Sequence, residues 1–155
     1  MNDQATPPVY DWDRARAGDR LDPVTRRILP EKIAEYVEVE HDENPRFRAG
    51  DGEPDGVPIP LVRIYAPLLR RELVAAQGCA YPGFTTPAVD WALQLFRSPR
   101  PGDEVRSVTS LADKFVRRER RYVEWNVDAW IGGEPLLKLT YVNLWEPGRA
   151  EDKTR

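Results

Sequence analysis

Residues 30–47, PEKIAEYVEVEHDENPRF, decide the expected fold, because this stretch carries the longest helical pattern in the chain. Pro30 suits the first helical turn, where its missing N–H leaves no hydrogen bond unmade. Apolar side chains follow at helical spacing and form one stripe, made by Ile33, Tyr36 and Val37. Pro45 disfavours helical backbone at Asn44. The sequence therefore predicts one buried helix that begins at Pro30 and ends near Asn44.

Polar side chains crowd the exit of this helix. They are His41, Asp42 and Glu43, and His41 is the chain's single histidine. Polar groups gathered where a core helix ends predict a functional site at this exit.

Composition excludes several classes of protein. The chain has 155 residues, with 41% hydrophobic and 32% charged content, which fits one soluble globular domain. A net charge of −3 gives no electrostatic reason to expect nucleic acid as a partner. No apolar run approaches the roughly 20 residues of a membrane helix, and no secretory signal precedes the domain. One cysteine and one histidine make a metal site improbable. We expect a cytoplasmic protein without a cofactor.

After this helix, the spacing of apolar residues changes from the helical period of 3.6 residues to the strand period of 2 residues. A first strand is expected at Asp19–Ile28 and a second helical region at Leu61–Gln77. Alternating patterns predict four more strands, at Val89–Arg97, Val105–Phe115, Tyr122–Ile131 and Leu136–Trp145. Gly132-Gly133 predicts a tight hairpin between the last two strands.

This order predicts an α+β fold, in which the helix covers one face of an antiparallel sheet. We expect an N-terminal segment at 1–18, one domain at 19–146 and a disordered tail at 147–155.

Four segments resemble MaoC-like acyl dehydratases, in the form found as the N-terminal half of double hot-dog dehydratases. They are Tyr10–Pro23, Pro30–Pro45, Ser98–Val105 and residues 113–137, DKFVRRERRYVEWNVDAWIGGEPLL, in the same order as in that family. The resemblance implies a single hot-dog domain, with a curved antiparallel sheet wrapped around a long central helix. It also implies a second hot-dog subunit as a partner.

The resemblance further implies addition or removal of water across the 2,3-double bond of an acyl thioester on coenzyme A or acyl carrier protein. This chemistry needs a carboxylate and an imidazole around one water. Active members supply them from an Asp-x-Asn-Pro-x-His motif. The matching stretch here, Asp42–Phe47, keeps the aspartate, asparagine and proline but has Phe47 at the histidine position. Phenylalanine cannot transfer a proton, so the resemblance implies a subunit that depends on a catalytic partner.

Each residue of the exit loop has a second interpretation. His41 is a candidate substitute for the missing imidazole, or a solvated histidine at a helix end. Asp42 binds substrate or water, or organises the turn through an Asx-type bond. Asn44 is a ligand or, more simply, a turn residue. Phe47 lines an acyl tunnel or fills the place of the histidine.

Two further groups of residues are candidates for substrate binding. By resemblance, Gly56 and Val57 approach the thioester and offer backbone N–H groups; otherwise they belong to a proline-rich surface loop. Arg118 and Arg121 lie in a basic cluster that could bind the phosphates of coenzyme A or an acidic carrier protein. The cluster can equally be a solvated hairpin tip.

Three functions remain open at this point. The chain is a subunit of an enoyl-thioester hydratase or dehydratase that works with a catalytic partner, or a non-enzymatic homodimer that binds acyl thioesters or hydrophobic ligands. The third possibility is a self-sufficient hydratase that uses Asp42 and His41.

Overall fold

The computed structural model describes residues 5–48 and 54–148. Eight elements follow one another along this part of the chain: β1 Val24–Arg27, α1 Pro30–Val39, α2 Ile59–Tyr65, α3 Arg70–Ala76, β2 Ala88–Leu95, β3 Glu104–Arg117, β4 Arg120–Ile131 and β5 Glu134–Leu144. The predicted α+β class and the sequence of elements are confirmed.

The strands form one five-stranded antiparallel sheet in the order β1-β3-β4-β5-β2. The expected hairpin at Gly132-Gly133 joins β4 to β5, and both glycines have positive φ, 57° and 83°. β1 is much shorter than the predicted Asp19–Ile28, because Pro23 stands immediately before it and proline cannot donate to a sheet ladder. β2 and the short β1 form the two edges of the sheet.

Helix α1 ends at Val39, five residues before the position that Pro45 suggested. His41 adopts a left-handed conformation with φ of 51°. The N–H of Asp42 donates to the carbonyl of Val37 at 3.0 Å, and the N–H of His41 donates to that of Glu38 at 3.3 Å. These two bonds are a Schellman motif, which stops the helix before the proline acts.

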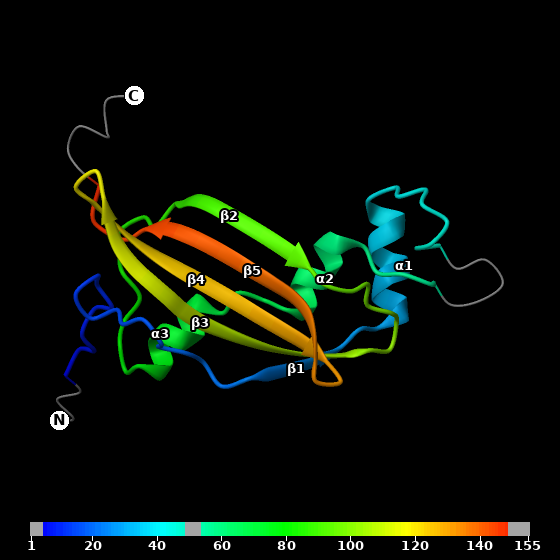
Figure 1. Cartoon of the computed structure of the whole chain (residues 1–155), viewed down its shortest axis with the longest axis horizontal. Coiled ribbons are helices and arrows are strands. Elements are labelled where there is room, and N and C mark those ends of the chain that lie inside the picture. The colour runs from blue at the N-terminus through cyan, green and yellow to red at the C-terminus, as the bar shows by residue number, and fades with distance from the viewer. Residues whose placement is uncertain (1–4, 49–53, 149–155) are drawn as a thin grey trace.

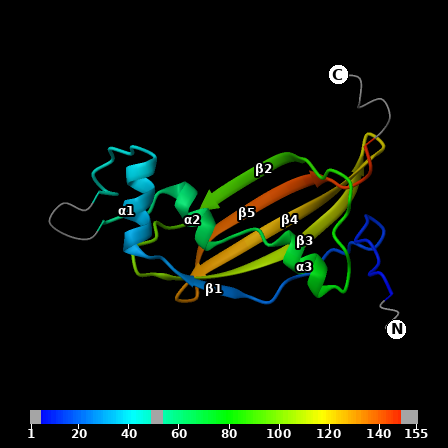
Figure 2. The same cartoon turned by 180° about the vertical axis from the view of Figure 1, so that it is seen from behind.

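Two short helices lie along one face of the sheet, as Figure 2 shows, while α1 lies at the end of the sheet where β3 begins (Figure 1). The helical region predicted at Leu61–Gln77 consists of two helices, α2 and α3, and Gly78 with φ of 69° follows α3. Ile33 and Val37 of α1 pack with α2 and the sheet in one core cluster. The helical layer is thus shared by three short helices rather than formed by one long one.

Alternation along β4 orients its side chains as predicted. Val123, Trp125, Val127 and Ala129 are buried on the helix face, whereas Ile131 is half-buried. Trp145 is also buried, but Trp91 on the edge strand β2 is 56% exposed. Trp91 therefore lies outside the core of this chain.

The N-terminal segment packs against the sheet. Tyr10 is 1% exposed, and its carbonyl accepts a 3.0 Å hydrogen bond from the indole of Trp145. Residues 1–4 of this segment, and 149–155 of the expected tail, lie outside the described residues. Within the described residues, no helix is long and apolar enough to cross a membrane.

Candidate functional site

The loop that follows α1 is held by hydrogen bonds from its own side chains. Asp42 Oδ1 accepts the N–H of Asn44 at 2.9 Å, and Asn44 Oδ1 accepts the N–H of Arg46 at 3.1 Å. The Asx-type turn that the sequence offered as an alternative is therefore present. Asp42 is half-buried and Asn44 is exposed, so the second carboxylate oxygen of Asp42 is still available to a ligand.

His41 lines an open cavity of about 380 Å³ beside the C-terminal turn of α1. The other lining residues are Ala34, Val37, Glu38, Phe47 and Arg48. Asp42 is absent from this lining, so the imidazole shares its cavity with the carboxylate of Glu38 instead. The pairing of His41 with Asp42 stays a prediction.

Phe47 is half-buried and packs against the main core cluster. Its ring also lies on Gly56, where an added Cβ would come within 3.2 Å of Phe47 Cε1. A side chain at Gly56 would have to displace the ring. The fold thus brings Phe47 and Gly56, two predicted site residues of the loop between α1 and α2, into direct contact.

The backbone at Gly56 and Val57 is buried, and Val57 is 7% exposed. Neither N–H donates a hydrogen bond to another described residue. Buried N–H groups are usually paired, so two donors beside Phe47 that have no acceptor among the described residues mark a place where a ligand carbonyl could bind. The middle of the loop, 49–53, lies outside the described residues.

A tyrosine on α1 belongs to the same neighbourhood. Burial raises the pKa of Tyr36, and the negative charges of Glu40 and Asp42 raise it further. The phenol therefore stays protonated at neutral pH. Sequence analysis placed Tyr36 only in the apolar stripe of the helix.

Arg48 was missed by sequence analysis. Its Nε donates a 2.7 Å hydrogen bond to the carbonyl of Asp42, which fixes the guanidinium at the cavity that His41 lines. No periodicity or motif marks this residue in the sequence. The contact depends on a turn that brings positions 42 and 48 together.

Arg118 and Arg121 lie far from the exit loop. Both belong to the hairpin between β3 and β4, whereas α1 packs at the opposite end of β3. β3 spans 14 residues, which corresponds to about 43 Å at about 3.3 Å per residue. Arg121 lies over the ring of Trp12 at 5.2 Å, and Arg118 is exposed. One chain therefore does not combine these arginines and Phe47 in a single site.

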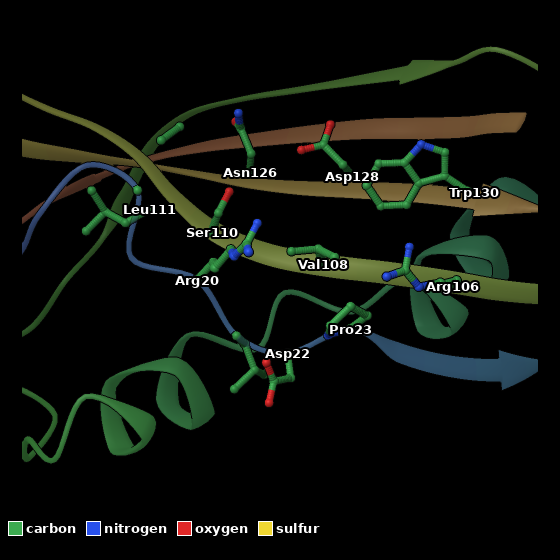
Figure 3. A pocket seen from close by; sticks show the side chains of 13 residues that line it. Arg20, Asp22, Pro23, Arg106, Val108, Ser110, Leu111, Asn126, Asp128 and Trp130 are labelled. Atoms are coloured by element: carbon green, nitrogen blue, oxygen red, sulfur yellow. The ribbon is translucent and has the colours of Figure 1, made fainter. Parts of the chain in front are cut away.

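A further pocket of about 700 Å³ lies on the face of the sheet away from the helices, and Figure 3 shows it. Ser110 of β3, Asn126 of β4 and Arg20 from the segment before β1 line it, and the guanidinium of Arg106 lies 6.0 Å from the ring centroid of Trp130. No predicted site residue lines this pocket. Among the described residues, no group of three or more metal-ligating side chains could hold a metal ion.

Comparison with known proteins leaves the family open but identifies the fold. No family model and no curated protein matches the sequence. Many solved structures are similar, including the following three. The ChsH1–ChsH2 complex from Mycobacterium tuberculosis matches at 15% identity and a TM-score of 0.63, over 84% of this chain and 86% of that one. A MaoC-like dehydratase from Rhodospirillum rubrum matches at 17% and 0.62, over 90% and 99%. The HadBC (3R-hydroxyacyl-ACP dehydratase) complex from M. tuberculosis matches at 13% and 0.62, over 81% and 92%.

The chain has the hot-dog fold. At these identities the likeness shows the fold alone, and the same fold carries different activities. The hot-dog expectation from the sequence is therefore confirmed. The fold does not identify the reaction, which depends on the residues of the site.

Proposed function

We propose that the chain is a MaoC-like hot-dog subunit of an enoyl-thioester hydratase or dehydratase, and that it binds the acyl group while a second hot-dog subunit carries out catalysis. Phe47 is the observation that carries this proposal. It stands at the histidine position of an otherwise matching Asp-x-Asn-Pro-x-His motif and packs on Gly56. A phenyl ring there shapes an apolar pocket and cannot move a proton.

The N–H groups of Gly56 and Val57, which have no acceptor within the described part of the chain, support the thioester as ligand. In hydration of an enoyl thioester, negative charge develops on the carbonyl oxygen, and preorganised N–H donors stabilise that charge. Asp42 contributes a carboxylate oxygen nearby, and the partner contributes the imidazole and most of the proton transfer.

The free edge of the sheet supports a second subunit. β2 is an edge strand with both faces largely exposed, and Val89 is 54% and Trp91 is 56% exposed. Long exposed edges invite pairing with another strand. Two of the similar structures are complexes. We infer that β2 pairs with a second hot-dog subunit.

Activity of the purified chain tests the division of labour. The chain alone should not hydrate crotonyl-CoA, whereas co-expression with a hot-dog protein that carries the intact motif should give a stable complex with hydratase activity. Turnover by the isolated chain at roughly 1 per second or faster, a rate typical of enzymes, would show that no catalytic partner is required.

A non-enzymatic homodimer that binds acyl thioesters or hydrophobic ligands is the second candidate, and the same Phe47 favours it. It predicts thioester binding without turnover, whether or not a second hot-dog protein is present. An active heteromer would exclude it.

A self-sufficient hydratase based on His41 is tested by His41→Gly. Glycine should also relieve the left-handed backbone at φ of 51°, so the free energy of unfolding should rise by about 0.5–1 kcal/mol. We expect any thioester turnover by the isolated chain to be the same in this variant as in the wild type, measured beside urea unfolding. A large loss of activity in a more stable protein would make His41 a catalytic residue.

A further inference from the structure

A cavity of about 470 Å³ lies between the helices and the edge of the sheet, apart from the exit loop of α1. It is lined by residues of α2, α3, β2, β5 and the segments between them: Pro60, Arg63, Ile64, Ala66, Pro67, Leu68, Arg70, Thr86, Ala88, Leu139, Tyr141 and Asn143. Seven of these residues are apolar and five are polar, so the cavity combines hydrophobic surface with several groups that could orient a ligand.

Two arginines face this cavity without an acidic partner. Arg63 and Arg70 form no ion pair with any described residue. Arg63 is held in place by aromatic groups: it donates to the hydroxyl of Tyr141, and its guanidinium lies 5.7 Å from the ring centroid of Trp91. A fixed, uncompensated guanidinium is well suited to bind a carboxylate.

An unsatisfied amide lines the same cavity. Asn143 is 1% exposed, and its Nδ2 donates to the carbonyl of Thr86 at 2.8 Å. Its Oδ1 has no hydrogen-bond partner among the described residues. A buried polar atom without a partner is costly in a folded protein. This oxygen accepts hydrogen bonds, so it would pair with an N–H or O–H group of a ligand and not with its carboxylate.

We propose that this cavity binds the distal end of an acyl chain that terminates in a carboxylate, with Arg63 and Arg70 pairing with the anion. The inference rests on the proposed thioester function and narrows its substrate class to ω-carboxyacyl thioesters. Pro60, at the start of α2, lines the cavity and is three residues beyond Val57 in the sequence.

A matched pair of ligands tests the proposal: adipyl-CoA and hexanoyl-CoA differ by the terminal carboxylate. Isothermal titration of the full chain should show that adipyl-CoA binds at least roughly tenfold more tightly, as a charge-assisted hydrogen bond predicts. Arg70→Gln should abolish this preference, so that adipyl-CoA and hexanoyl-CoA bind with about equal affinity. Arg71→Gln is the matched control, because Arg71 neighbours Arg70 but lies over the ring of Tyr81 at 4.4 Å and does not line the cavity.

The outcomes distinguish the carboxylate site from the proposed binding of acyl thioesters. Equal affinity for the two ligands, or the same loss of preference in Arg71→Gln and Arg70→Gln, would overturn the carboxylate site and leave thioester binding intact. If neither ligand binds, thioester binding itself fails, and the carboxylate site fails with it. Circular dichroism of both variants shows whether each remains folded.

Discussion

In the proposed function, this chain lacks catalysis because Phe47 stands where a histidine would transfer protons. Replacing Phe47 is therefore the most direct test at the level of a single residue. Phe47→His should place an imidazole against Gly56, in the loop whose turn Asp42 organises. General acid–base catalysis typically contributes about 10²–10⁴-fold, so we expect hydration of crotonyl-CoA by the isolated chain to rise above background by a factor in that range.

Phe47→Asn provides the matched control. It introduces a polar side chain of similar reach without a group that transfers protons near neutral pH. If both variants are equally inactive, the exit loop is not the catalytic position of this fold. If both gain activity alike, the gain comes from opening the cavity and not from the imidazole.

Tyr10 gives a pH-dependent prediction. Its hydroxyl donates a 2.5 Å hydrogen bond to Asp19 Oδ2. Burial, followed by this hydrogen bond and the charge of Asp19, raises the pKa of Tyr10 above its usual range. Because the folded-state pKa lies above the unfolded value of about 10, the stability from the neutral phenol is full below about pH 10 and falls as the pH rises further.

Tyr10→Phe removes both the hydrogen bond and this titration. At pH 7 we expect the free energy of unfolding to fall by about 1–2 kcal/mol. The difference from the wild type should shrink above about pH 10, where the wild type begins to lose its own advantage. Urea unfolding at pH 7, 9 and 10.5 measures both effects. A difference that stays constant over this range would contradict the assigned pKa shift.

Among the elements, the hairpin between β3 and β4 contains an unusual turn. Arg118 and Glu119 both have positive φ, 50° and 60°, although neither is glycine or asparagine. A two-residue turn of this kind normally uses residues that tolerate left-handed backbone. Arg118→Asn should therefore raise the free energy of unfolding by about 0.5–1 kcal/mol.

Arg117→Asn is the control for this change, since it removes the same charge from the end of β3. Greater stability in Arg118→Asn than in Arg117→Asn would confirm the turn strain, and equal stability would contradict it. Binding of an acyl-CoA by the same proteins tests the predicted phosphate contact. Unchanged affinity in Arg118→Asn would mark the cluster as a solvated tip.

The sequence predicts an element well where a local pattern determines it. Val123, Trp125, Val127 and Ala129 alternate because one face of β4 is buried, and paired glycines permit the tight turn after it. The end of α1 could not be placed this way. His41 there takes a backbone conformation that glycine or asparagine normally adopts, so the residue type gave no signal.

The features of the site that the sequence does not predict depend on contacts between segments that are far apart in the chain. The Asx turn at Asp42 joins neighbours in sequence and could be anticipated. Arg63 and Tyr141 are 78 positions apart, and they meet because α2 packs beneath β5. Hydrophobic periodicity shows which face of an element is buried but not which element covers it.

The whole molecule exposes one long sheet edge, and its pairing determines the assembly. A strand that pairs with its own copy about a two-fold axis must run antiparallel, so residues near its middle face each other across the axis. The middle of β2, Ala88–Leu95, lies between Trp91 and Ala92. Ala92 is exposed there and small enough to change without loss of core packing.

Ala92→Asp should place two carboxylates close together at such an axis, and like charges directly opposite each other destabilise strand pairing. If the chain forms a homodimer, we expect its dissociation constant to rise at least roughly tenfold, which corresponds to about 1.4 kcal/mol. Sedimentation velocity over a concentration series measures this, with Ala92→Ser as the uncharged control. In a heteromer, the partner supplies a different residue opposite position 92, and the effect of Ala92→Asp on affinity should depend on the charge of that residue. A basic residue there would make the complex tighter instead of weaker. Dimers of Ala92→Asp as tight as those of Ala92→Ser would show that the subunits do not pair through β2.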